Sequence, residues 1–137
     1  MSPPNFTGKV ALITGSSGGI GAEIAVQFAQ YGGSVVITGR DGAKLAKVAD
    51  RIGQLSNGSN CLQVVGDLLA DPSLPHTLIN RTIGEFGRLD VLVNNAGGAT
   101  EKGGLSHPDL MKRYARVFGL NVQKVIELTS LAVPYLE

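Results

Sequence analysis

The sequence has little of what marks disulfide-rich, nucleic-acid-binding or membrane proteins. Cys61 is the single cysteine, which excludes an internal disulfide and a cysteine-based zinc site. Lys and Arg number 12 and Asp and Glu 11, so the net charge of +1 provides no strongly basic surface. No apolar run is long enough to span a membrane, and residues 1–8 lack a charged signal segment. We therefore expect no nucleic-acid or membrane partner, and a cytoplasmic location with an organelle as the open alternative.

Metal-ligand spacing is also missing, because His76 and His107 stand apart from each other and from paired carboxylates. What the sequence does have is apolar content of 43% against 17% charged residues, in 137 residues that include 19 glycines. A chain of this size buries enough surface for a core of its own. We expect residues 1–137 to form a single globular domain.

Short apolar runs alternate with helical patterns along the whole chain. The runs predict strands at residues 9–14, 35–37, 62–65 and 89–93, and apolar spacing predicts helices at 19–31, 41–55, 73–86 and 108–136. Strands that are separated by helices of this length are parallel, with right-handed crossovers. The expected fold is α/β, a doubly wound parallel sheet of the Rossmann-like type with strand order 3-2-1-4. Its ligand crevice should lie at the carboxyl ends of the first and fourth strands.

A glycine-rich loop lies between the first strand and the first helix. Residues 14–21 read Thr-Gly-Ser-Ser-Gly-Gly-Ile-Gly, without the Gly-Lys-Ser/Thr of a P-loop. A pyrophosphate needs backbone N–H groups, a helix N-terminus and no intervening Cβ. Gly15, Gly19 and Gly21 would supply the turn, the close approach and the helix–strand contact. The candidate binding residues of this loop are Gly15, Ser16, Ser17, Gly19, Ile20 and Gly21. The alternative is a turn without a ligand.

A second motif, Asn94-Asn95-Ala96-Gly97, follows the fourth predicted strand. Together the two motifs resemble those of the classical short-chain dehydrogenase/reductase family, and the likeness runs from about Lys9 to the last helix. The resemblance implies the dinucleotide-binding part of an oxidoreductase whose small-molecule substrate is a carbonyl compound or an alcohol. In that family the second motif steadies the sheet centre and lines the adenosine ribose.

The same resemblance assigns adenine binding to Asp67 and Leu68, at the end of the third strand. The Asp67 carboxylate would accept a hydrogen bond from the adenine amino group, and the Leu68 N–H would donate one to a ring nitrogen. The alternative for Asp67 is a carboxylate that caps its own loop.

The end of the second strand bears on the choice of cofactor. An acidic residue there binds the ribose 2′-hydroxyl of NAD(H), whereas an arginine accommodates the 2′-phosphate of NADP(H). Gly39 stands at the acidic position and Arg40 follows it, which favours NADP(H) over NAD(H). The alternative is a solvated Arg40 and no preference. Asp41 is better placed to cap the following helix.

The resemblance also implies a catalytic role for Asn121, which would hold a water in a proton relay towards a lysine; the alternative is an exposed polar side chain. The family reaction needs a Tyr with a Lys four residues later, yet Tyr31 and Tyr114 are followed at that spacing by Val35 and Phe118, and Tyr135 lies two residues before the last one, Glu137. We expect a domain that stops before the catalytic segment and gives no turnover alone. An N-terminal half of an oxidoreductase, a nucleotide-binding module without turnover and an interaction protein remain open.

The predicted helix at 108–136 is apolar nearly all round, and the fourth strand would form an apolar sheet edge. An unpaired surface of this kind favours association. We therefore expect a homo-oligomer that forms through the 108–136 helix.

Overall fold

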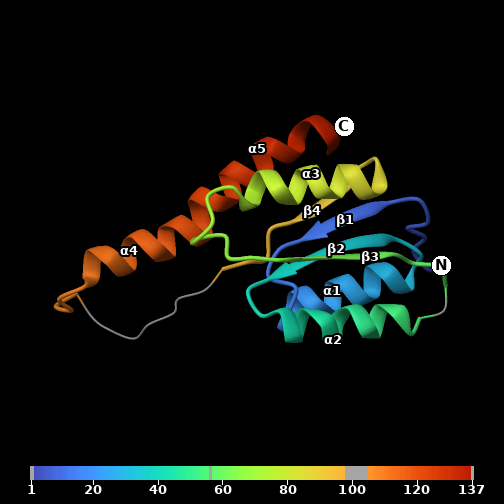
Figure 1. Cartoon of the computed structure of the whole chain (residues 1–137), viewed down its shortest axis with the longest axis horizontal. Coiled ribbons are helices and arrows are strands. Elements are labelled where there is room, and N and C mark those ends of the chain that lie inside the picture. Colours follow the sequence, from blue (N-terminus) through green and yellow to red (C-terminus); the bar gives the residue numbers. More distant parts are fainter. Residues whose placement is uncertain (1, 56, 98–104, 137) are drawn as a thin grey trace.

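A computed structural model describes residues 2–55, 57–97 and 105–136. In it, four strands alternate with helices in the expected manner (Figure 1). The elements are β1 Val10–Ile13, α1 Gly19–Gln30, β2 Ser34–Gly39, α2 Gly42–Gly53, β3 Cys61–Val65, α3 Leu74–Phe86, β4 Val91–Val93, α4 Leu110–Phe118, a π-helical segment Gly119–Gln123 and α5 Lys124–Leu136. The four strands form one parallel sheet in the order β3-β2-β1-β4, which confirms the predicted α/β topology.

β1 is the centre of the sheet, and every one of its side chains is buried. Leu12 pairs with Val36 of β2 on one side and with Leu92 of β4 on the other. Alternate residues of a strand point to opposite faces, so a central strand with both faces covered has to be apolar throughout. This explains why residues 10–13 read as an unbroken apolar run.

Helices α1 and α2 cover one face of the sheet, and α3 and α5 cover the other (Figure 1). On one face, Ala11 and Ile13 of β1 join an apolar cluster with residues of α1 and α2. On the other face, Leu12 belongs to a cluster with Leu78 of α3 and Leu128 of α5. The sheet therefore lies between two apolar layers, and in folds of this type ligands bind at the carboxyl ends of the strands.

β4 begins later than expected, at Val91 instead of Leu89. The Val10 N–H donates to the Asp90 carboxylate at 2.9 Å, so a side chain takes the place of a ladder carbonyl at this end. Arg88 donates two further hydrogen bonds, of 2.8 and 2.7 Å, to the same carboxylate. These hydrogen bonds, the Arg88 one foremost, hold the pKa of Asp90 below its usual range.

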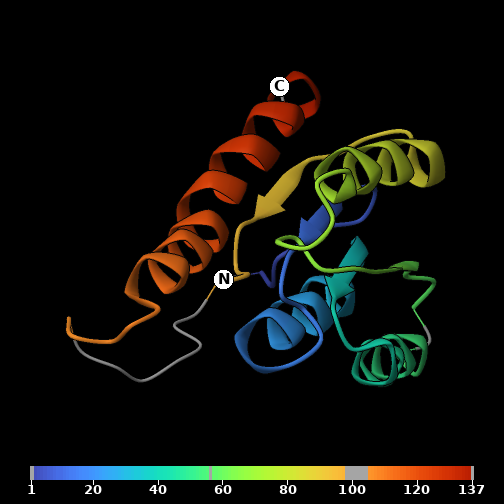
Figure 2. The ribbon, with the colours of Figure 1, turned by 60° about the vertical axis from the view of Figure 1, so that its left-hand side comes forward.

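The last helix differs from the prediction of one regular helix over 108–136. It begins at Leu110 and contains a π-helical segment at 119–123, between α4 and α5. No side chain caps the start of α4; the Asp109 N–H donates to Nδ1 of His107 at 3.1 Å. Figure 2 shows α4 and α5 as one long rod whose α4 end projects beyond the sheet. No residue of α4 is buried.

Residues 98–104, which follow the second motif, lie outside the described residues, as do Met1, Ser56 and Glu137. No helix in the described part of the chain is both long and apolar enough to cross a membrane. Across residues 2–55, 57–97 and 105–136, no three His, Cys, Asp or Glu side chains group in a way that could hold a metal ion.

Asp41 caps α2 as expected, because its Oδ1 accepts from the N–H groups of Ala43 and Lys44 at 3.0 and 3.2 Å. Replacing Asp41 with Ala should lower the free energy of unfolding by about 1 kcal/mol, since two N–H groups lose their acceptor. Asp41→Asn is the matched control and should stay close to the original chain, because asparagine caps about equally well. Urea unfolding followed by circular dichroism measures both; equal midpoints for the two variants would show that the cap contributes nothing.

Candidate functional site

The carboxyl ends of β1 and β4 are joined by the Thr14 side chain. Thr14 is 2% exposed, and its Oγ1 accepts hydrogen bonds from the N–H groups of Asn95 at 3.0 Å and Ala96 at 2.9 Å. Its hydroxyl donates to the Val93 carbonyl at 3.4 Å, and its own N–H donates to the same oxygen at 3.1 Å. One side chain thus orders the backbone that leaves β4. No role for Thr14 was predicted from the sequence. Its position directly before the glycine loop was the one feature that could have indicated a structural role.

The glycine loop is packed against this junction. Nδ2 of Asn95 donates to the Gly15 carbonyl at 3.0 Å. A Cβ on Gly15 would lie 2.9 Å from Cα of Ala96, and the φ of Gly15 is +61°. A Cβ on Gly21 would lie 2.5 Å from the Gly15 carbonyl oxygen. Both positions therefore need glycine for the close approach of loop, helix and strand end.

The two serines of the loop face different surroundings. Ser16 is fully buried, and its hydroxyl donates to the Ile13 carbonyl at 2.7 Å and accepts from the Thr38 N–H at 2.9 Å. Ser16 was a candidate binding residue, but its hydroxyl is used to join β1 to β2. Ser17 lies on the open side of the loop, where its hydroxyl has no partner among the described residues.

α1 begins without a side-chain cap: its N-cap residue is Gly18, and no side chain accepts from its first turn. The first N–H groups of a helix have no partner within the helix, and they carry the positive end of its dipole. Gly19 (φ +56°) and Ile20 (74% exposed) lie at this end, in a hollow between α1 and α2. An anion could therefore bind to backbone N–H groups here.

A crevice of about 210 Å³ lies along the carboxyl edge of the sheet, where the topology predicted it. The glycine loop, the ends of β2, β3 and β4, and the π-helical segment each contribute to its wall. Its lining residues include seven of the candidates from the sequence: Gly15, Ser17, Arg40, Asp67, Leu68, Ala96 and Gly97. Leu120 closes it from the last helix and was not anticipated from the sequence. The other seven candidates lie outside this wall: Ser16, Gly19, Ile20, Gly21, Asn94, Asn95 and Asn121.

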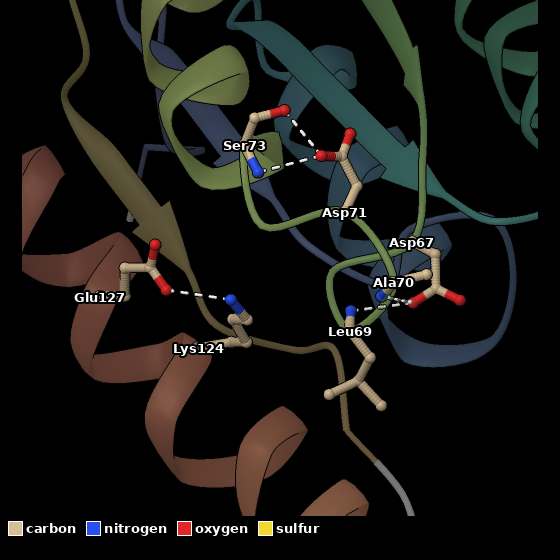
Figure 3. A network of polar contacts seen from close by, with 7 residues as sticks. All are labelled: Asp67, Leu69, Ala70, Asp71, Ser73, Lys124 and Glu127. Carbon is tan, nitrogen blue, oxygen red and sulfur yellow. Dashed lines mark hydrogen bonds and ion pairs between the residues drawn. The ribbon is translucent and has the colours of Figure 1, made fainter.

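The Asp67 carboxylate faces its own loop with one oxygen (Figure 3). Its Oδ1 accepts from the N–H groups of Leu69 at 2.9 Å and Ala70 at 3.3 Å, so the carboxylate does cap its own loop. Its Oδ2 has no hydrogen-bond partner in the described part of the chain, and neither has the Leu68 N–H. A free acceptor and a free donor are therefore adjacent at the crevice wall, while the Leu68 side chain is buried in the core.

The loop that carries Asp67 continues into α3 through a second aspartate (Figure 3). Asp71 accepts from the hydroxyl and the N–H of Ser73 at 2.6 and 2.9 Å, and the hydroxyl hydrogen bond foremost lowers the pKa of Asp71. Across from it, Lys124 and Glu127 pair within α5 at 3.1 Å. These contacts order the chain on both sides of the crevice without entering it.

Asn94 and Asn121 connect the end of β4 with the last helix. Nδ2 of Asn94 donates to Oγ1 of Thr129 on α5 at 3.1 Å. Nδ2 of Asn121 donates to the Val117 carbonyl at 2.8 Å, and its carboxamide oxygen lies where a side chain on Gly97 would begin. Asn121 therefore lies in the π-helical segment against the end of the second motif, although its side chain is exposed.

A second, polar hollow adjoins the crevice beyond β2. It is lined by Ser17, Arg40, Asp41, Gly42 and Lys44, so two cations and one carboxylate surround it. The Asp41 carboxylate already accepts from two N–H groups of α2. Ser17 and Arg40 line both hollows, and a phosphate next to the crevice would meet their donors first.

Known proteins resemble this chain over almost its full length. A family model described as short chain dehydrogenase matches residues 9–137. An uncharacterized oxidoreductase of Mycobacterium tuberculosis is 40% identical over 92% of this chain, which spans 46% of that protein. The solved structure of a 7 alpha-hydroxysteroid dehydrogenase complexed with NADH and 7-oxo glycochenodeoxycholic acid has a TM-score of 0.85 and 35% identity, and covers 96% of this chain. L-sorbose reductase from Gluconobacter frateurii, complexed with NADPH and L-sorbose, has a TM-score of 0.82 and 32% identity, and also covers 96%. The chain spans 49% of each of those two structures, about half the length of its relatives.

Replacing Thr14 with Val should test the junction between β1 and β4. Valine has a similar shape but no hydroxyl, so two N–H groups lose their acceptor, and we expect a loss of about 2 kcal/mol in the free energy of unfolding. Thr14→Ser keeps the hydroxyl and should retain most of that free energy. Urea unfolding of the three proteins measures the difference. A valine variant as stable as the serine variant would show that the Thr14 hydroxyl does not stabilise the junction.

Proposed function

The chain belongs to the short-chain dehydrogenase family, and we propose that it forms the NADP(H)-binding part of an oxidoreductase that interconverts a carbonyl and a hydroxyl group. The observation that carries this proposal is the crevice, which brings the glycine loop, Asp67 and Arg40 together at one edge of the sheet. Dinucleotides bind to folds of this type at that edge.

The pyrophosphate, the adenine and the adenosine ribose of the cofactor would each meet a group that is free to bind them. The uncapped N-terminus of α1 would take the pyrophosphate on its backbone N–H groups. The free Oδ2 of Asp67 would accept from the adenine amino group, while the Leu68 N–H would donate to a ring nitrogen. Ser17 lines the crevice beside the expected place of the ribose.

The choice between NADP(H) and NAD(H) depends on the end of β2. The two similar structures hold NADH and NADPH respectively, so the family likeness alone does not choose between them. Gly39 presents no carboxylate to a 2′-hydroxyl, and Arg40 lines the polar hollow together with Lys44. A guanidinium is suited to bind phosphate with two parallel hydrogen bonds. These residues support NADP(H).

The proposed reaction needs a tyrosine that donates or accepts the proton and a lysine that lowers its pKa. None of the three tyrosines among these 137 residues is followed by Lys at the fourth position. We therefore expect this sequence by itself to bind cofactor without turnover, with Asn121 acting only once a Tyr–Lys pair is present. A dinucleotide-binding module without turnover is the second candidate function, because the crevice alone would suffice for it.

Titration calorimetry with NADPH and NADH tests the cofactor assignment. We expect the original chain to bind NADPH more tightly, and Arg40→Ala to weaken NADPH binding about tenfold through loss of a charge-assisted contact. NADH binding should be unchanged in this variant, and Arg40→Lys should keep part of the preference because it keeps the charge. Equal affinities for both cofactors in the original chain would contradict the NADP(H) assignment, and no binding of either would contradict the proposed function.

The last helix supports a further proposal, self-association. Met111, Tyr114, Phe118, Val122 and Ile126 are all exposed, with exposed fractions from 37% to 71%, at spacings of three and four residues. Apolar residues in this pattern form one continuous stripe on a helix. A stripe of this kind on the surface is typical of an interface.

Sedimentation velocity at several concentrations tests this proposal. The original chain should sediment as a dimer or larger species, and the double variant Met111→Glu, Ile126→Glu should shift towards monomer, because carboxylates are costly to bury in an apolar contact. Lys47→Glu, an exposed change on α2, is the control and should leave the oligomer intact. A monomeric original chain at all concentrations would exclude the interface.

A further inference from the structure

Gly39 ends β2 at a place where a side chain has no room. A Cβ on Gly39 would lie 2.8 Å from both Cβ and Oγ of Ser17, closer than nonbonded carbon atoms approach. The φ of Gly39 is not in the left-handed region, so its backbone conformation alone does not call for glycine. What restricts residue 39 is therefore the Ser17 side chain, which comes from the glycine loop 22 residues earlier in the sequence.

Ser17 cannot easily move away. A rotation about its χ1 angle would displace Oγ but leave Cβ in place, and Cβ is itself one of the two close atoms. The loop is held on the preceding side, because Ser16 N–H donates to the Thr38 carbonyl at 3.0 Å and the Ser16 hydroxyl accepts from Thr38 N–H. Nδ2 of Asn95 also donates a hydrogen bond to the Gly15 carbonyl. A shift of the loop would break these hydrogen bonds, which are buried or partly buried, and would therefore be destabilising.

We propose that Ser17 and Gly39 act as one steric unit that determines cofactor specificity: the Ser17 side chain occupies the space from which a residue at position 39 would present a carboxylate to a ribose 2′-hydroxyl. This inference rests on the proposed function, because it concerns how the same crevice selects between NADP(H) and NAD(H). Ser17 and Arg40 both line the crevice and the polar hollow, and Lys44 lines the hollow, so the Ser17 side chain borders the space that a group on the ribose 2′ position would enter. An acidic residue at 39 would be accommodated only when residue 17 has no Cβ.

The test uses half-cofactors that fill only the adenosine side of the crevice: 2′,5′-ADP, which carries a 2′-phosphate, and ADP, which carries a free 2′-hydroxyl. Calorimetry on the 137-residue chain should show that Gly39→Asp loses about tenfold or more in affinity for 2′,5′-ADP, by charge repulsion and by displacement of the loop. It should gain less than about twofold for ADP, because the carboxylate has no room to reach the ribose. The double variant Ser17→Gly, Gly39→Asp should bind ADP about tenfold more tightly than Gly39→Asp alone.

Ser17→Ala, Gly39→Asp is the matched control, since alanine removes the hydroxyl but keeps Cβ. It should bind ADP as weakly as Gly39→Asp alone. If it binds ADP as tightly as the double variant with Ser17→Gly, the hydroxyl and not the Cβ is the obstacle, which would overturn the steric unit. The proposal is also overturned if Gly39→Asp alone binds ADP as tightly as the double variant Ser17→Gly, Gly39→Asp.

If the aspartate variants fold poorly, a stability measurement still tests whether Ser17 and Gly39 are sterically coupled. Gly39→Ala introduces only the Cβ, and it should lower the urea midpoint of unfolding in the original chain but not in Ser17→Gly. Equal midpoint shifts in both backgrounds would contradict the coupling without any ligand present. Binding to the original chain distinguishes failure of the proposed function from failure of this inference. Equal affinity for 2′,5′-ADP and ADP would contradict the NADP(H) assignment. The coupling between Ser17 and Gly39 would still be tested by the ADP affinities of the variants and by their urea midpoints.

Discussion

The structure depends on how closely three backbone segments approach one another at the carboxyl end of β1. The glycine loop, the first turn of α1 and the chain leaving β4 meet there at distances that exclude a Cβ at Gly15 and Gly21. The Thr14 hydroxyl and the Asn95 carboxamide satisfy the N–H and carbonyl groups that this approach takes away from water. Buried backbone groups without such partners would cost several kcal/mol in the free energy of folding. The crevice depends on this close junction, which the Thr14 and Asn95 side chains hold together through hydrogen bonds.

The sheet order then determines what surrounds the junction. Because β1 lies between β2 and β4, the connections from β1 and from β4 leave the sheet in different directions, and a crevice opens between them. The end of β3 adds Asp67 to one side, and the π-helical segment adds Leu120 to the other. Residues from five separate parts of the sequence therefore form one wall, although no single motif contains them.

The alternation of apolar runs and helical stripes was enough to predict the topology, since parallel strands with helical crossovers leave few other arrangements. The two motifs also predicted which loops meet at the crevice. Side-chain direction was less accessible: Ser16 and Ser17 look equivalent in the sequence, but the hydroxyl of the first is used to join β1 to β2. The π-helical segment was missed, because one extra residue per turn hardly changes an apolar pattern that runs nearly all round the helix.

The N-termini of α1 and α2 differ in whether they can bind an anion. α1 has no side-chain cap, so its N-terminal N–H groups remain available to a ligand anion, whereas α2 has its own N–H groups taken by Asp41. A phosphate near α2 would therefore gain little from that helix terminus and would have the Asp41 carboxylate close by. It would depend on the side chains of Arg40, Lys44 and Ser17, all of which line the polar hollow. The backbone can thus serve a pyrophosphate common to both cofactors, while recognition of a 2′-phosphate is left to side chains, which substitution at single positions can change.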